Sequence, residues 1–199
     1  MRAAPGGLWS SLRSFPAKPA RTGSIPMPTR SRALREDLGL DLGGARVLLL
    51  GAGGAGRTAA LKLAAEGVSE LFLVNRTRSK AEAVASEIRE RSLGVKLVEG
   101  YPAGAVDLVL NATSLGLNPN DPVPFDERQF SLRRAASVYD MIYRPAETAL
   151  LKAAKAAGCR AANGLGMLLY QGAKALELWT GQNAPVEVMR HELEKNVYG

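Results

Sequence analysis

Three glycines between positions 51 and 56 carry the clearest binding chemistry in the chain. Gly51, Gly53 and Gly56 follow the spacing GxGxxG, directly after the apolar run 47–50 and before a helical pattern. In a strand–turn–helix unit, the first glycine permits a sharp turn, the second lets the backbone approach a pyrophosphate, and the third lets the helix pack closely on the strand. Amide groups at the start of such a helix face bound phosphates. The spacing and its context predict a dinucleotide-binding turn; the alternative is a glycine-rich turn that binds nothing.

The residues after the second predicted strand indicate which dinucleotide would bind. Sites that prefer NAD usually place Asp or Glu here to bind the ribose 2′-hydroxyl, whereas this chain has Asn75. No carboxylate would repel a 2′-phosphate, and the guanidinium of Arg76 can donate charge-assisted hydrogen bonds to one. Further donors follow at Thr77, Arg78, Ser79 and Lys80. We expect NADP to bind in preference to NAD, mainly through Arg76; Arg78 and Lys80 could instead be solvated residues of a basic loop.

Polar residues follow two later strands as well. Asn111, Thr113 and Ser114 come directly after the buried-strand pattern DLVL, where they could face a nicotinamide ring or simply form a capping turn. Tyr143 follows another strand and could donate its hydroxyl to a substrate, although a tyrosine before Arg-Pro is more often a packing residue. Gln171 lies in an otherwise apolar helix, and a buried amide there needs the backbone, water or a ligand as partner.

The composition argues against several other classes of function. One cysteine and one histidine give no basis for an internal disulfide, a metal cluster or a histidine-based triad, so no metal site is expected. No apolar run approaches the roughly 20 residues of a membrane span. The net charge of +7 comes entirely from the first 35 residues, which hold seven basic and no acidic side chains. The remainder is neutral, so we expect no nucleic-acid surface on the folded part.

A regular alternation of elements is expected to position these residues. Apolar runs predict strands near 47–50, 70–75, 95–98, 106–111, 137–140 and 159–162. Helical patterns lie near 31–38, 55–66, 79–91, 147–157, 165–180 and 185–196. Strands that alternate with helices indicate an α/β fold with a doubly wound parallel sheet. Six strands suit the order 3-2-1-4-5-6 of a Rossmann-like domain, in which ligands bind where the strand order reverses.

The N-terminal segment differs from the rest. Residues 1–31 are rich in Pro, Ser, Gly, Ala and Arg and have no sustained periodicity, which favours a disordered basic tail before a single domain at 32–199. An Arg-rich, acid-free composition is also typical of a transit peptide. A stretch outside the native coding sequence is a third interpretation.

Residues 32–199 resemble the shikimate dehydrogenase family. The resemblance rests on GAGGAG at 51–56, NRTRSK at 75–80, NATSLGL at 111–117, DMIYRP at 140–145 and NGLGMLLYQGA at 163–173, in this order. Members of the family reduce 3-dehydroshikimate to shikimate with NADPH in aromatic amino-acid biosynthesis, so the resemblance implies a cytoplasmic oxidoreductase of the shikimate pathway.

The resemblance also implies roles for particular residues. The turn Gly51, Ala52, Gly53, Gly54 and Ala55 would bind the pyrophosphate, and residues 75–80 would bind the 2′-phosphate. Met141 and Gly164 would lie on the nicotinamide side, and Tyr143 and Gln171 would contact the substrate.

The chain departs from the family before residue 32. The family has an N-terminal domain of about a hundred residues that supplies a catalytic lysine and aspartate, whereas only 31 residues precede the match here. Because reduction of a ketone needs a proton donor, we expect a form that lacks the catalytic pair, with no catalytic residue assigned to this chain. A non-catalytic NADP-binding module and a quinate dehydrogenase relative are the alternatives. Without the other domain, the following leucines are expected to be partly exposed and to favour self-association: Leu34, Leu38, Leu168 and Leu169.

Overall fold

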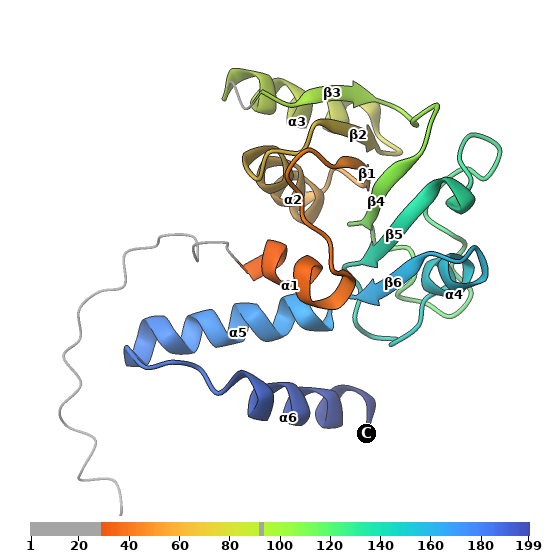
Figure 1. Cartoon of the computed structure of the whole chain (residues 1–199). Coiled ribbons are helices and arrows are strands. Elements are labelled where there is room, and N and C mark those ends of the chain that lie inside the picture. Colours follow the sequence, from red (N-terminus) through yellow and green to blue (C-terminus); the bar gives the residue numbers. More distant parts are fainter. Residues whose placement is uncertain (1–28, 92–93) are drawn as a thin grey trace, which may run out of the picture.

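Six short strands run parallel in one sheet in the computed structural model, which describes residues 29–91 and 94–199. The strand order is β3-β2-β1-β4-β5-β6, so the predicted fold class and strand order are confirmed. Figure 1 shows the twisted sheet running from β3 at the top to β6, with α5 and α6 below it. From β1 the chain adds β2 and β3 on one side of the sheet and then crosses to add β4 on the other side of β1. The strand order therefore reverses between β1 and β4, and this is the switch point.

The observed elements lie within a few residues of the predicted ones. The strands are β1 (Arg46–Leu50), β2 (Glu70–Val74), β3 (Lys96–Glu99), β4 (Val106–Asn111), β5 (Ala135–Asp140) and β6 (Arg160–Asn163). The helices are α1 (Thr29–Leu38), α2 (Gly54–Ala65), α3 (Arg78–Glu90), α4 (Ala149–Ala156), α5 (Leu165–Thr180) and α6 (Val186–Tyr198), with a short 3-10 turn at Leu132–Arg134. Because α1 begins at Thr29, it includes the last residues of the segment predicted to be a tail; residues 1–28 lie outside the described part.

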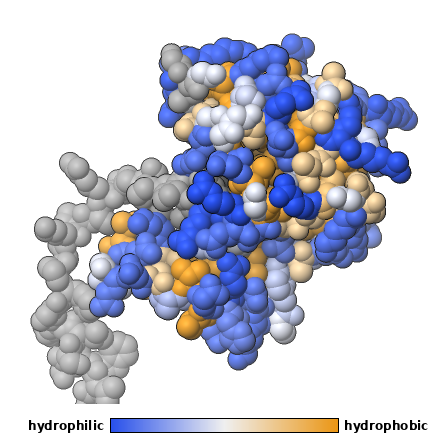
Figure 2. Space-filling view, viewed as in Figure 1, coloured by the Kyte–Doolittle hydropathy of each residue, from blue (hydrophilic) through white to orange (hydrophobic). Residues whose placement is uncertain are grey.

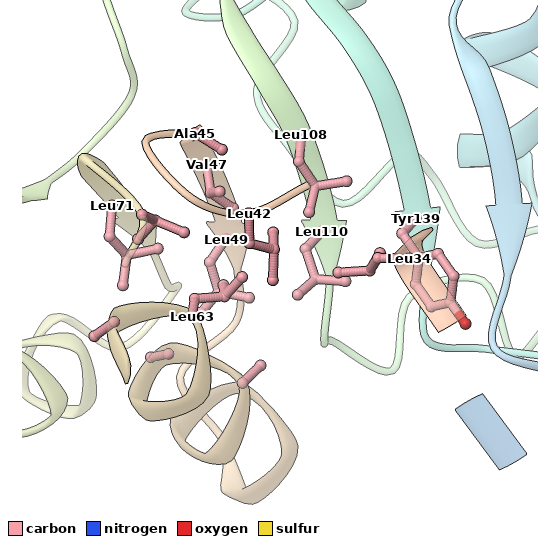
Figure 3. Packing of buried hydrophobic residues seen from close by; sticks show 14 of the residues in the cluster. Leu34, Leu42, Ala45, Val47, Leu49, Leu63, Leu71, Leu108, Leu110 and Tyr139 are labelled. Atoms are coloured by element: carbon pink, nitrogen blue, oxygen red, sulfur yellow. The ribbon is translucent and has the colours of Figure 1, made fainter. Parts of the chain in front are cut away.

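Alternate residues of the central strands face opposite layers. Val47 and Leu49 point into a cluster with α1, α2, α3 and α5 (Figure 3). Leu48 and Leu50 point into a second cluster with α4 and the segment around Phe130. All four side chains are fully buried, as expected for a parallel sheet with both faces covered. The two layers hold the strand ends at fixed positions.

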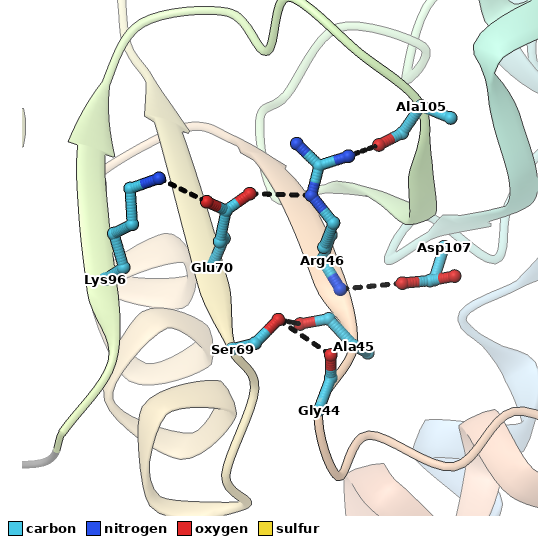
Figure 4. A network of polar contacts seen from close by, with 8 residues as sticks. All are labelled: Gly44, Ala45, Arg46, Ser69, Glu70, Lys96, Ala105 and Asp107. Carbon is cyan, nitrogen blue, oxygen red and sulfur yellow. Dashed lines mark hydrogen bonds and ion pairs between the residues drawn. The ribbon is translucent and has the colours of Figure 1, made fainter.

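At the amino-terminal ends of the strands, charged residues from four adjacent strands form a network. Glu70 on β2 pairs with Lys96 on β3 at 2.5 Å and with Arg46 on β1 at 2.6 Å (Figure 4). The backbone N–H of Arg46 donates to Asp107 on β4 at 2.7 Å, and its guanidinium donates to the carbonyl of Ala105. This network lies at the edge opposite the predicted site.

The carboxyl ends of five strands stand in one row. The strand register aligns Val74 with Leu50, Leu50 with Asn111, Asn111 with Asp140, and Asp140 with Asn163. Each turn that the sequence singled out follows one of these residues. The fold therefore brings these turns together at the carboxyl-terminal ends of the strands.

The predicted exposure of the leucines is wrong for three of the four. Leu34, Leu38 and Leu169 are buried, with at most 4% of each residue exposed. The reason is that α1 packs against α5, so the two helices cover each other's apolar faces. Leu168 alone is partly exposed. The large exposed apolar side chains on α5 are instead Leu178 and Trp179 at its C-terminal end.

Candidate functional site

The glycine-rich turn joins β1 to α2 with the geometry that its sequence predicts. Gly51 adopts a φ of +103°, and its N–H donates to the carbonyl of Val74 at 2.7 Å. A Cβ at Gly56 would overlap the backbone carbonyl of Gly51, so only glycine permits this close approach of helix and strand. A Cβ at Gly53 would meet nothing within 4 Å, because that position faces open space. The turn therefore packs tightly on the protein at Gly56 and leaves room for a ligand at Gly53.

A cavity of about 340 Å³ lies against this turn. It unites the turn with the ends of β2 and β4, which come from either side of β1. Its lining consists of Gly51, Gly53, Val74, Asn75, Arg76, Thr77, Lys80, Ala112, Thr113, Ser114, Leu115 and Pro124. The structure thus gathers glycines, two cations and three hydroxyl groups around one hollow at the switch point. This is a set of donors suited to a phosphorylated ligand.

Asn75 braces two parts of this cavity. Its Oδ1 accepts a hydrogen bond from the N–H of Ala52 at 3.0 Å, and its Nδ2 donates to the carbonyl of Thr77 at 2.7 Å. One amide therefore connects the glycine-rich turn to the segment that carries Arg76. The sequence identified Asn75 only by the absence of a carboxylate and gave no sign of this bridging role.

The two arginines of this segment point to different places. Arg76 lines the cavity beside the glycine-rich turn. Arg78 lines a neighbouring cavity of about 350 Å³ with Glu99 and Tyr101, and its Nε donates to Glu82 at 2.9 Å. Ser79 follows Arg78 in the first turn of α3 and is absent from the lining of both cavities. Of the predicted 2′-phosphate ligands, the cavity therefore brings together Asn75, Arg76, Thr77 and Lys80.

Asn111 shapes the loop on the other side of the cavity rather than facing a ligand. It is fully buried, and its Oδ1 accepts hydrogen bonds from the N–H and the hydroxyl of Thr113 at 3.0 and 2.8 Å. Its Nδ2 donates to the carbonyl of Leu115 at 3.2 Å. With these bonds made, its amide is committed to the protein, while Thr113 and Ser114 remain at the cavity wall.

Asp140, at the end of β5, is a buried carboxylate that the sequence analysis did not single out. It accepts hydrogen bonds from Nδ2 of Asn111 at 2.9 Å, the N–H of Ile142 at 3.1 Å and the hydroxyl of Thr148 at 2.7 Å. Burial raises the pKa of Asp140, and these three donors act against that rise. An acidic residue directly after the apolar run of a predicted strand was the available signal.

The residues predicted on the nicotinamide and substrate side lie beyond the lining of this cavity. The N–H of Gly164 donates to the carbonyl of Ile142 at 3.1 Å, and a Cβ at Gly164 would overlap the carbonyl of Met141. Met141 and Gly164 are thus neighbours, at the ends of β5 and β6. Tyr143 is 38% exposed and Gln171 is partly buried on α5.

Two further classes of site find no support in the described residues. Within 29–91 and 94–199, no group of three or more His, Cys, Asp or Glu side chains could hold a metal ion. No helix in the same residues is long and apolar enough to cross a membrane.

Comparisons with known proteins agree with the geometry. A family profile described as "Shikimate / quinate 5-dehydrogenase" matches residues 33–117, and one described as "Shikimate 5′-dehydrogenase C-terminal domain" matches residues 164–194. A shikimate dehydrogenase (NADP(+)) of Methanopyrus kandleri is 42% identical over 167 residues, which are 80% of this chain and 57% of that protein.

Solved structures show the same partial coverage. Shikimate 5-dehydrogenase of Thermus thermophilus, in complex with NADP(H) and shikimate, matches with a TM-score of 0.69 and 35% identity, over 82% of this chain and 59% of that one. Quinate dehydrogenase of Corynebacterium glutamicum, in complex with NAD, matches with a TM-score of 0.71 and 32% identity, over 83% and 60%. The chain therefore spans somewhat less than two thirds of the length of these relatives.

Proposed function

The chain belongs to the shikimate dehydrogenase family, and we propose that its described residues form the NADP-binding part of such an enzyme. The observation that carries the proposal is the 340 Å³ cavity in which the glycine-rich turn, Arg76 and Lys80 meet. The open position at Gly53 gives a pyrophosphate room to approach the backbone. The amide groups at the start of α2 supply donors for it.

The preference for NADP over NAD follows from the groups at the end of β2. Arg76 and Lys80 offer two positive charges to a 2′-phosphate, and Thr77 adds a hydroxyl group to the same lining. Asn75 contributes no negative charge, and its amide is occupied by Ala52 and Thr77. A hydrogen bond to a charged group contributes roughly 1.5–3 kcal/mol, so the guanidinium alone is expected to favour NADP about tenfold or more.

The substrate side is assigned by resemblance to the family. Met141 and Gly164 would lie beside the nicotinamide, and Tyr143 and Gln171 would contact a shikimate-type substrate. NADPH, when bound, would supply the hydride for 3-dehydroshikimate. A partly exposed tyrosine hydroxyl and a helical amide are suited to hydroxyl groups on such a ring. The match to quinate dehydrogenase makes quinate the second candidate substrate.

A proton donor is the remaining requirement of the proposed reaction. Reduction of a carbonyl needs an acid within hydrogen-bond reach of its oxygen. We assign this role to no described residue of the chain. The proposed function of residues 29–91 and 94–199 is therefore the binding of cofactor and substrate, without a group assigned to proton transfer.

The test is the reduction of NADP by the purified chain with shikimate, and in parallel with quinate, together with an NADP titration on the same sample. Binding without turnover is the expected result. Binding with turnover would show that the chain carries its own proton donor and is an enzyme by itself. Failure to bind NADP would overturn the proposed function.

A further inference from the structure

Asp140 connects two loops that the proposed function assigns to different ligands. Its Oδ1 accepts from Asn111, whose own Oδ1 holds Thr113 in the wall of the cofactor cavity. The same Oδ1 accepts from the N–H of Ile142, in the turn that carries Met141 and Tyr143. A single carboxylate oxygen thus joins the cofactor-side loop 111–116 to the substrate-side loop 141–144.

The surroundings of Asp140 exclude solvent from this junction. Asn111 and Asp140 are fully buried, and Thr148 is 2% exposed. The two loops also touch directly, because a Cβ at Gly116 would lie 3.2 Å from Cδ1 of Ile142 and 3.1 Å from Cγ2 of Thr148. Hydrogen bonds in such surroundings are costly to leave unmade.

The chemistry of the junction calls for an ionised carboxylate. All three partners of Asp140 are donors: an amide Nδ2, a backbone N–H and a hydroxyl that also caps α4 through the N–H of Leu151 at 3.3 Å. An ionised carboxylate only accepts, so it matches all three, whereas an asparagine would present its own donor to one of them. The cross-strand pair of Asn111 and Asp140 follows from the register of β4 and β5.

We propose that Asp140 is a positioning residue that fixes the cofactor-side loop 111–116 and the substrate-side loop 141–144 in one arrangement through its hydrogen bond to Asn111. The inference rests on the proposed function for the roles of the two loops. Its consequence is that a change at Asp140, on the β5 side, weakens binding of NADP on the β4 side without a contact between Asp140 and the cofactor.

The test compares Asp140→Ser with Asp140→Asn. A serine hydroxyl can still accept from the N–H of Ile142 two residues ahead but is too short to reach Asn111, so the variant cuts the bridge and keeps the turn. An asparagine keeps an acceptor for both Asn111 and Ile142. Asp140→Ser loses the bonds from Asn111 and Thr148, of which only the bond from Asn111 reaches the cofactor-side loop. We therefore expect it to raise the Kd for NADP about tenfold, the effect of that one charge-assisted hydrogen bond, and Asp140→Asn to stay within about threefold of the wild type.

Hydrogen exchange of backbone amides supplies a second readout that needs no ligand. Asp140→Ser is expected to speed exchange in both 112–116 and 141–144 relative to Asp140→Asn. Asn111→Ser cuts the same bond from β4 and is expected to speed exchange in 141–144, which tests the proposal even if Asp140→Ser does not fold.

Val138→Ala is the matched control for a general loss of stability. Val138 is fully buried two residues earlier on β5, so its truncation lowers the Tm without touching either loop, and its Kd for NADP is expected to equal that of the wild type. The proposal is overturned if Asp140→Ser has the same amide exchange rates in the two loops and the same Kd for NADP as Asp140→Asn. It is also overturned if Val138→Ala weakens NADP binding as much as Asp140→Ser does. A wild type that does not bind NADP would refute the proposed function, while the exchange data would still decide whether Asp140 couples the loops.

Discussion

Asn75 and Arg76 both line the cavity at the end of β2, but they serve it in different ways. The amide of Asn75 is bonded to Ala52 and Thr77 and so holds two parts of the cavity wall together. The guanidinium of Arg76 is the group that we propose to bind the 2′-phosphate. Two consecutive residues thus carry a structural and a ligand-facing role.

Arg76 and Arg78 are predicted to differ in their effect on cofactor binding. Arg76→Ala should weaken NADP about tenfold or more and leave NAD unchanged, because it removes a guanidinium from the proposed 2′-phosphate site. Arg78→Ala should change NADP affinity much less, because Arg78 lies at the neighbouring cavity and pairs with Glu82. Parallel titrations of both variants with both cofactors check this. Equal losses in the two variants would refute the separate roles.

At this scale, the sequence predicted residue types better than contacts. Arg76 and Lys80, which line the cavity, could be named as candidates because a basic residue after the second strand is itself the sequence signal. The roles of Asn75, Asn111 and Asp140 could not be predicted, because each depends on a partner from another segment. Asn111 and Asp140, for example, are 29 positions apart in the sequence. Only the register of the strands makes these pairs.

At the scale of the elements, two glycines near the start of α2 are expected to have different roles: Gly56 in stability and Gly53 in cofactor binding. Gly56→Ala should lower the free energy of unfolding by about 3 kcal/mol, because its Cβ would overlap the backbone of Gly51. Gly53→Ala should cost less stability, because its Cβ meets open space, but should weaken NADP by occupying the approach of the pyrophosphate. Urea denaturation and an NADP titration distinguish the two. A stable Gly56→Ala protein would contradict the close packing of α2 on β1.

The charged network at the opposite edge predicts a dependence of stability on pH. Lys96 and Arg46 lower the pKa of Glu70 in the folded state. A carboxylate with a lowered folded-state pKa stabilises the fold above its unfolded-state pKa and loses that contribution as the pH falls. We expect Glu70→Gln to reduce the decline in Tm below about pH 4.5.

The matched control for this prediction is Glu90→Gln. Glu90 is an exposed carboxylate at the end of α3, so its replacement removes the same charge from a solvated position. Thermal unfolding between pH 7 and pH 3 measures the three proteins. If the Tm of the wild type and of Glu70→Gln declined identically at low pH, the network would not contribute to the pH dependence of stability.

The elements themselves were largely predictable because their patterns are local. Apolar runs such as 47–50 and the glycine at 51 mark a strand and its end without reference to the rest of the chain. The packing of α1 on α5 was not predictable from such patterns. The exposure predicted for Leu34 and Leu38 failed for that reason, since their burial depends on a helix more than a hundred residues away.

On the scale of the whole molecule, the two C-terminal helices carry several large exposed apolar side chains. Leu178 and Trp179 on α5 are 54% and 82% exposed, and Val188 on α6 is 64% exposed. Figure 2 shows hydrophobic surface among hydrophilic residues in the lower part of this face, where α5 and α6 lie. Apolar patches of this kind favour association.

We therefore expect the purified chain to self-associate as its concentration rises, and Trp179→Ser to weaken that association. Leu117→Ser is the control, because Leu117 is 55% exposed in a loop near the cavity instead. Sedimentation velocity over a range of concentrations measures both variants. A wild type that remains monomeric throughout would contradict the prediction.

The cavity between the glycine-rich turn and the end of β2 is proposed above all to bind NADP in preference to NAD. The measurement that decides this is a side-by-side equilibrium titration of the wild-type chain with the two oxidised cofactors, in the same buffer and at the same ionic strength. We expect NADP to bind at least about tenfold more tightly. Equal affinities, tighter binding of NAD, or binding of neither would contradict the proposal.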